Sequence, residues 1–262
     1  MCVRSLPAGN YILALQGHFM KAHLVTFADG PFSTRLYSFL AQAESMELFD
    51  TIKTHSFSTL QQDFQAQHAE FVNANRRGFG FWVWKSQAIL EALESADSDD
   101  CIIYLDAGYT LNPKGRDRFL EYLEITCDSR HSLLSFQNIH TEAYWTKADL
   151  PARLGLKTNG TEMKTSQLTA NFMILRPAPD NFDFVRLWQQ ISIEKDYHYL
   201  NDSPSEIPNH PLFREHRHDQ SISSLIRKMR GSEITHLETQ SYEGYFDKYK
   251  NSLPCWATRS KT

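Results

Sequence analysis

Short apolar runs alternate along this chain with longer segments whose apolar residues recur at helical spacing. Runs rich in β-branched and aromatic residues predict strands at residues 23–27, 49–57, 101–105, 132–136 and 168–175. Recurrence every three or four positions predicts helices at residues 33–43, 59–73, 86–96 and 181–192, with two more beginning near 113 and 221. This alternation predicts an α/β fold in which a mostly parallel sheet is sandwiched by helices.

The segments between these elements carry weaker signals. Ser33 is expected to cap the first helix. Residues 137–165 are polar and predict irregular structure, and residues 197–211 hold three prolines and predict an exposed loop. Because a strand-like run begins just after Met20, we expect one domain over residues 20–262, with residues 1–19 as an extension.

The most informative segment ends the strand predicted at 101–105. Asp106 follows that apolar run, and Ala107 and Gly108 come next. Open α/β sheets bind ligands at the carboxyl ends of their strands, and a glycine there lets a ligand approach the backbone. Asp106 is therefore a candidate to hold a divalent cation or a sugar nucleotide, and the alternative is a carboxylate that caps a turn.

A basic and aromatic block precedes the predicted helix at 86–96. Arg76, Arg77 and Lys85 bracket the stretch Gly-Phe-Gly-Phe-Trp-Val-Trp at residues 78–84. Arginine forks match phosphate oxygens, and a lysine ammonium acts as a point charge. Lys85 stands where a helix dipole disfavours a cation, which predicts an anionic partner for it. A packed turn with surface arginines is the alternative for this block.

A third polar block, His-Arg-His-Asp-Gln-Ser at residues 216–221, begins the last predicted helix. Asp219 is the candidate base for an acceptor hydroxyl, and His218 is its rival. A histidine or Asp219 could also complete a metal shell begun by Asp106, or Asp219 could cap the helix. Weaker candidates for sugar contacts are polar or aromatic residues of the irregular segment and the following strand: Glu142, Trp145, Lys147, Gln167 and Asn171.

Composition narrows the class of protein. A formal net charge of −4 and a pI of about 6.3 predict no binding to duplex nucleic acid. No apolar run is long enough to span a bilayer. The four cysteines, at positions 2, 101, 127 and 255, form no CxxC pair, which argues against a zinc knuckle or a disulfide framework and fits a reducing cytosol.

With these three blocks in order, residues 20–230 resemble nucleotide-sugar glycosyltransferases of the GT-A fold. They look most like small bacterial and viral enzymes that build surface glycans, and the Trp-x-x-Lys ending at Lys85 is similar to fungal and plant Golgi galactosyl- and mannosyltransferases. The resemblance implies that donor-binding residues come from the first strand and its loop, the basic block and the strand end: Thr26, Phe27, Ala28, Asp29, Arg76, Arg77, Lys85, Asp106, Ala107 and Gly108. It places acceptor or sugar contacts at Glu142, Lys147, Gln167, Asn171 and His216.

One departure from the family matters for the cofactor. The family's Asp-x-Asp motif binds a metal and the sugar diphosphate, but here the second aspartate is replaced by Gly108. Asp106 is then the expected ligand of Mn²⁺ or Mg²⁺, aided by Asp219 or a histidine, or the basic residues replace the metal. Metal dependence stays open at this point.

The expected function is transfer of a sugar from a nucleoside-diphosphate donor, UDP favoured, to a hydroxyl of a glycan or glycolipid in polysaccharide synthesis. The protein is expected in the cytoplasm, peripheral to a membrane through its acceptor. Two alternatives remain. One is a metal-dependent sugar-nucleotide hydrolase or phosphodiesterase using Asp106, His216, His218 and Asp219, and the other is a non-catalytic glycan-binding module.

Overall fold

The computed structural model describes residues 13–15, 18–236, 238 and 245–258 of the 262-residue chain. Most of the expected extension therefore lies outside the described residues. Two strands from its end, β1 (Leu13–Leu15) and β2 (His18–Met20), form a short antiparallel pair. No described helix is both long enough and apolar enough to cross a membrane.

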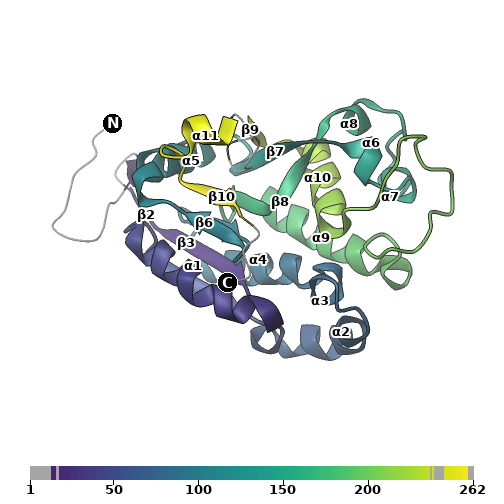
Figure 1. Ribbon diagram of the computed structural model, residues 1–262, viewed down its shortest axis with the longest axis horizontal. Helices are drawn as coiled ribbons and strands as arrows, with labels where there is room; N and C mark the ends of the chain where they lie inside the picture. Colours follow the sequence, from purple (N-terminus) through teal and green to yellow (C-terminus); the bar gives the residue numbers. More distant parts are fainter. Residues whose placement is uncertain (1–12, 16–17, 237, 239–244, 259–262) are drawn as a thin grey trace.

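A six-stranded sheet forms the centre of the molecule (Figure 1). Its strand order is β4-β3-β5-β8-β7-β9, with bounds Thr51–His55, Ala22–Phe27, Cys101–Leu105, Ser166–Leu175, Leu133–Thr141 and Glu233–His236. β8 is antiparallel to both of its neighbours, β5 and β7, and the other pairings are parallel. The mostly parallel sheet predicted from the sequence is thereby confirmed.

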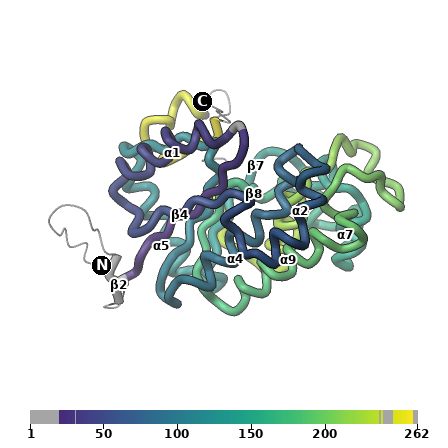
Figure 2. Tube along the Cα trace, turned by 90° about the horizontal axis from the view of Figure 1, so that it is seen from below, coloured from purple at the N-terminus to yellow at the C-terminus, as the bar shows by residue number. Residues whose placement is uncertain are grey.

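Helices cover both faces of this sheet. The helices α1 (Ser33–Ser45) and α5 (Arg116–Asp128) pack against one face, and α4 (Trp84–Ser95), α9 (Pro179–Tyr197) and α10 (His218–Arg230) against the other. Figure 2 shows α4 and α9 on one side of the molecule, together with α2 (Gln62–Ala74), and α1 on the other.

Strand β5 is apolar throughout because both of its faces are buried. Ile102 and Tyr104 pack into the core beneath α4 and α9, whereas Cys101, Ile103 and Leu105 pack into the core beneath α1 and α5. Successive side chains of a strand point to opposite faces, so a strand covered on both sides cannot place a polar residue in water. The first polar side chain, Asp106, comes where the strand leaves the sheet.

The segment predicted to be irregular is more ordered than expected. The strand predicted at 132–136 continues to Thr141, and three short helices follow, namely α6 (Glu142–Trp145), α7 (Asp149–Arg153) and α8 (Thr161–Lys164). Helices of four or five residues are too short for a periodic signal, and they form here because residues such as Leu150 and Met163 are buried in the core.

Other boundaries differ by a few residues. Ser33 does not cap α1 but is its first residue, and the N-cap position is Phe32. The side chain of Asp29 instead accepts a hydrogen bond from Gly30 N and caps the preceding 3₁₀ turn, Gly30–Phe32. The loop predicted at 197–211 is only partly exposed, since Leu200 is buried. The remaining elements are 3₁₀ turns at Phe57–Thr59 and Pro113–Gly115, strands β6 (Tyr109–Leu111) and β10 (Cys255–Ala257), helix α3 (Gly78–Phe81) and helix α11 (Tyr245–Tyr249).

Candidate active site

Two adjoining cavities lie at the carboxyl ends of β3 and β5, where the sequence analysis placed the site. The larger has a volume of about 420 Å³, and its lining includes aromatic side chains and the strand-end backbone at Ala107 and Gly108. The smaller has a volume of about 130 Å³ and a mostly polar lining that includes Lys85 and Asp219. Both cavities are lined by Trp82, Asp106, Asn171 and Arg217, which therefore form their common border.

Lys85 joins the two carboxylates that the sequence analysis singled out. Its Nζ lies 3.3 Å from Asp106 Oδ1 and 3.0 Å from Asp219 Oδ2. The Lys85 and Asp219 side chains are 3% and 6% exposed, whereas that of Asp106 is 31% exposed. The hydroxyl of Tyr104 donates a hydrogen bond of 2.6 Å to the same Asp106 oxygen. The anionic partner expected for Lys85 is thus a pair of carboxylates, one directly after β5 and one in the first turn of α10.

The cluster is electrostatically coupled. Burial alone would lower the pKa of Lys85, but the charges of Asp106 and Asp219 outweigh it and raise that pKa. Burial raises the pKa of Asp219 to about 6, against the opposing effect of the Lys85 ammonium. At neutral pH the lysine is therefore charged, and Asp219 changes its charge just below neutrality.

A left-handed turn brings Trp82 to the border of the cavities. All five residues from Gly78 to Trp82 have positive φ, between 51° and 83°. A left-handed conformation costs about 1–2 kcal/mol for each residue with a side chain. Stacking of Trp84 on Phe27, with ring centroids 3.6 Å apart, and a 2.9 Å hydrogen bond from Trp84 Nε1 to Gly78 O hold the turn in place. Backbone strain of this kind concentrates at functional sites.

His218 lines the smaller cavity from the start of α10. Its Nδ1–H donates to Leu200 O at 2.9 Å, so Nε2 is the bare nitrogen, and it lies 3.7 Å from Asp202 Oδ1. Burial lowers the pKa of His218 to about 4, which makes it a neutral hydrogen-bonding group and a weak base. Of the two candidate bases, Asp219 has the pKa better suited to proton transfer near neutral pH.

His216 lies outside both cavity linings. Its Nε2–H donates to Tyr199 O at 2.8 Å, and its Nδ1 accepts from Lys147 N at 3.3 Å. Both ring nitrogens thus serve backbone groups. The geometry gives His216 a structural role and does not bring it to either cavity.

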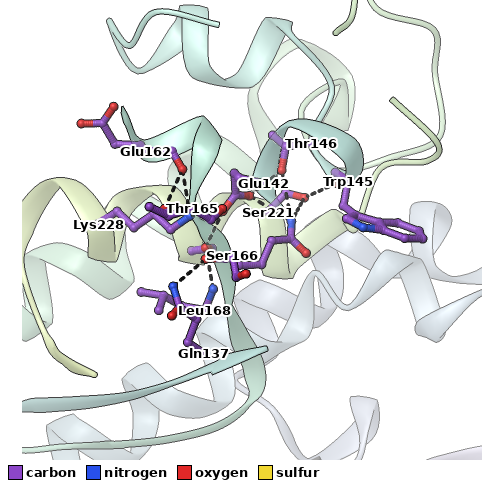
Figure 3. A network of polar contacts seen from close by, with 12 residues as sticks. Gln137, Glu142, Trp145, Thr146, Glu162, Thr165, Ser166, Leu168, Ser221 and Lys228 are labelled. Atoms are coloured by element: carbon purple, nitrogen blue, oxygen red, sulfur yellow. Dashed lines mark hydrogen bonds and ion pairs between the residues drawn. The ribbon is translucent and has the colours of Figure 1, made fainter. Parts of the chain in front are cut away.

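Three other predicted sugar contacts are also buried away from the cavities. Glu142 is fully buried, pairs with Lys228 Nζ at 2.7 Å and accepts a hydrogen bond of 2.9 Å from Gln167 Nε2. Figure 3 shows this polar network between α6 and α10. Lys147 Nζ donates to the carbonyls of Asn201 and Ser203. These side chains hold the helices and the loop after α9 in place.

Three of the four donor-binding residues predicted at the end of the first strand line the larger cavity. Phe27, Ala28 and Asp29 line the larger cavity, but Asp29 already accepts hydrogen bonds from Gly30 N and Phe57 N. Thr26 is fully buried outside both linings.

The remaining predicted residues divide between the cavities and the surface. Asn171 borders both cavities and accepts a hydrogen bond of 2.9 Å from Tyr109 OH. Arg77 lines the smaller cavity and pairs with Asp202 at 3.2 Å, whereas Arg76 is exposed and lines neither.

Sequence reasoning missed Arg217 as a site residue. Its guanidinium lies 4.2 Å from the centre of the Trp145 ring and borders both cavities, while Trp145 itself lines neither. Arg217 belongs to the block at 216–221, in which the sequence analysis assigned chemical roles only to the histidines and Asp219. Tyr104 was missed because an aromatic residue in an apolar strand looks like core packing.

The donor set does not fit a divalent cation on its own. Within the described ranges 13–15, 18–236, 238 and 245–258, no three His, Cys, Asp or Glu side chains are grouped as metal ligands. The Lys85 ammonium also lies against both Asp106 and Asp219, the two nearest carboxylates. A hard cation prefers six or more oxygen ligands, and both carboxylates of this site already have the Lys85 ammonium as a positive partner.

Comparison with protein-family models gives no match, and comparison with curated proteins gives none either. Among solved structures, the chain is similar to a glycosyltransferase involved in the glycosylation of the major capsid of PBCV-1. That likeness has 10% identity and a TM-score of 0.49, and it covers 91% of this chain and 92% of the other. The chain is also similar to mouse xyloside xylosyltransferase 1, with 12% identity, a TM-score of 0.46, and 91% and 97% covered.

Proposed function

We propose that this protein is a glycosyltransferase that moves a sugar from a nucleoside-diphosphate donor to a hydroxyl group of a glycan. The observation that carries the proposal is the Asp106–Lys85–Asp219 cluster at the border of an aromatic cavity and a polar one. A nucleotide sugar needs both an aromatic and a polar cavity, because its base is a flat aromatic ring and its sugar ring carries several hydroxyl groups.

The donor is proposed to lie across both cavities. The larger one, lined by Phe27, Trp82 and Trp84, would take the base and ribose. The diphosphate would pass the common border, where the Arg217 guanidinium can donate paired hydrogen bonds to phosphate oxygens. The sugar would enter the smaller cavity, where Asn171 and Asp219 can bind its hydroxyls.

The role of Asp219 depends on the stereochemical course. If the reaction inverts the anomeric carbon, Asp219 takes the proton of the acceptor hydroxyl, a task suited to a carboxylate with a pKa near 6. If the reaction retains the configuration, Asp219 orients the donor sugar. In both cases Lys85 holds the Asp219 carboxylate in position, and Asp106 is the second carboxylate partner of the lysine.

The finer assignment is also a proposal. We favour a UDP-sugar as donor, a glycan or glycolipid in surface polysaccharide synthesis as acceptor, and a cytoplasmic location. Because the carboxylates already have a resident cation in Lys85, we propose that donor binding needs no Mn²⁺ or Mg²⁺. The charge of the departing diphosphate would then be stabilised by Arg217 and the cluster.

Calorimetric titration with UDP, GDP, CMP and dTDP, each in EDTA, Mn²⁺ or Mg²⁺, tests this proposal. We expect one nucleoside diphosphate to bind with a similar Kd in EDTA and in metal. A Trp82→Ala variant should weaken that binding at least tenfold, and an exposed control, Tyr37→Ala, should not. Binding of none of the nucleotides would contradict the donor assignment, and binding in metal alone would contradict the role of Lys85.

The two alternatives predict different results. A metal-dependent hydrolase using His216 and His218 would release free sugar faster than it transfers sugar, yet both histidines already donate to backbone carbonyls. A glycan-binding module would bind oligosaccharides and no nucleotide. No specific observation favours either over sugar transfer.

A further inference from the structure

Three sulfur atoms meet at the end of β5 opposite to Asp106. Cys101 Sγ and Cys127 Sγ are 3.8 Å apart, and Met20 Sδ lies 3.4 Å from the first and 3.2 Å from the second. The residues come from the start of β5, the last turn of α5 and the end of β2. Their convergence from three distant parts of the chain is a product of the fold.

The two thiols differ in environment. Cys101 is fully buried, whereas Cys127 is partly exposed. A hydrogen bond from Cys101 lowers the pKa of Cys127, the nearby Arg176 charge acts in the same direction, and these effects outweigh burial. The same contact raises the pKa of Cys101, and burial raises it further. A partly exposed thiol with a lowered pKa beside a second thiol is the arrangement found at peroxide-sensitive cysteines.

We propose that Cys101 and Cys127 form a peroxide-reactive dithiol that closes to an intramolecular disulfide. The Cys127 thiolate attacks one peroxide oxygen, the O–O bond breaks, and Cys127 becomes a sulfenic acid while the other oxygen leaves as water after protonation. The Cys101 sulfur then attacks the Cys127 sulfur, and its proton and the sulfenic hydroxyl leave as a second water. Two thiols are oxidised by two electrons, and one peroxide is reduced to two waters.

The geometry requires only a small movement. A disulfide bond is about 2.05 Å long, so the two sulfur atoms must approach by roughly 1.8 Å from their separation of 3.8 Å. Cys255 is the matched comparison, because it is equally buried but has no such thiol neighbour among the described residues. Since the dithiol and Asp106 lie at opposite ends of β5, this inference is independent of the proposed function.

Intact-mass measurement tests the proposal on the full chain, in a Cys2→Ser background. After one equivalent of hydrogen peroxide and alkylation of the remaining thiols, we expect a loss of about 2 Da and one alkylated cysteine, Cys255. Proteolysis without reductant should yield a peptide that links Cys101 to Cys127. The melting temperature of the oxidised protein should rise by roughly 5 °C and return with dithiothreitol.

Three single-cysteine variants make the result decisive. Cys127→Ser should abolish both the cross-linked peptide and the thermal shift, whereas Cys255→Ser should change neither. A Cys101→Ser protein should stop at a Cys127 sulfenic acid, which dimedone traps. Oxidation that adds 16, 32 or 48 Da without a cross-link, a cross-link to Cys255, or no reaction of the thiols would each overturn the proposal.

Discussion

At the scale of single residues, Lys85 decides the electrostatics of the site. Its ammonium is almost fully buried and is the near partner of both Asp106 and Asp219. Removal of one partner of a buried ion pair leaves an uncompensated charge and costs about 3–5 kcal/mol. The three side chains therefore form one unit, in which a change at any member is felt by the other two.

Lys85→Met tests this unit. We expect a loss of about 3–5 kcal/mol in the free energy of unfolding, measured in urea at pH 7.5, together with a weaker affinity for the nucleotide donor. Lys157→Met, at an exposed position, should change the unfolding free energy by less than about 0.5 kcal/mol. Equal stability of the two variants would show that the lysine is not held by its carboxylates.

Asp219 sets the expected pH dependence of transfer. Since its pKa lies at about 6, the base is protonated below that value, and kcat/KM for an inverting reaction should fall about tenfold per pH unit below pH 6 and stay level above it. Asp219→Asn should remove this limb and reduce the rate at least 100-fold. The surface variant Asp117→Asn should keep the wild-type profile, and an unchanged limb in Asp219→Asn would assign the titration to another group.

At the scale of elements, the left-handed turn from Gly78 to Trp82 connects stability to the site. A Cβ added at Gly78 would lie 2.5 Å from the Trp82 ring, and Trp82 lines both cavities. Glycine is needed here both for its positive φ of 59° and for the close approach of the indole. A substitution at Gly78 should therefore act on ligand binding as well as on folding.

Gly78→Ala and Gly155→Ala form a matched pair. Both positions have positive φ, but a Cβ at Gly155 meets nothing within 4 Å. Gly155→Ala should lower the free energy of unfolding by about 1 kcal/mol through backbone strain alone and should not change nucleotide binding. Gly78→Ala should cost more and weaken nucleotide binding at least tenfold in the same calorimetric titration, because Trp82 must move. Similar binding by both variants would remove Trp82 from the donor cavity.

At the scale of the whole molecule, buried histidines control acid stability. Burial lowers the pKa of His68 and of His218 to about 4, from an ordinary value of 6.5. Between pH 6.5 and 4 the unfolded chain binds protons that the folded protein does not, so stability is complete above 6.5 and falls as the pH falls through this window. Asp219 acts in the opposite direction between about pH 6 and 4, because the folded state favours its protonated form.

Unfolding in guanidinium chloride at pH 7.5 and pH 5 measures this linkage. Relative to pH 7.5, each of the two histidines should lower the free energy of unfolding at pH 5 by roughly 2 kcal/mol. Asp219 should partly offset this loss by raising the free energy of unfolding by about 1 kcal/mol. His68→Gln should reduce the pH-dependent loss in the free energy of unfolding by about 2 kcal/mol. A pH-independent unfolding free energy would contradict the neutral state of these histidines.

The sequence by itself determined the order of the longer helices and of five of the six strands of the central sheet, and the position of Asp106. Both follow from local patterns, since an apolar run such as 101–105 has to be buried and its first carboxylate has to mark the strand end. It also indicated that Lys85 needs an anionic partner, because the helix dipole is a local property too.

Only the tertiary structure decided which polar residues meet. Asp219 is far from Lys85 in the sequence, and its contact with that ammonium exists because α10 and α4 pack on the same face of the sheet. The same packing buries Glu142, Gln167 and His216 among structural partners, although their residue types suggested ligand contacts. Residue type and spacing report local conformation, but the environment that makes a polar side chain catalytic or structural is assembled by contacts between distant segments.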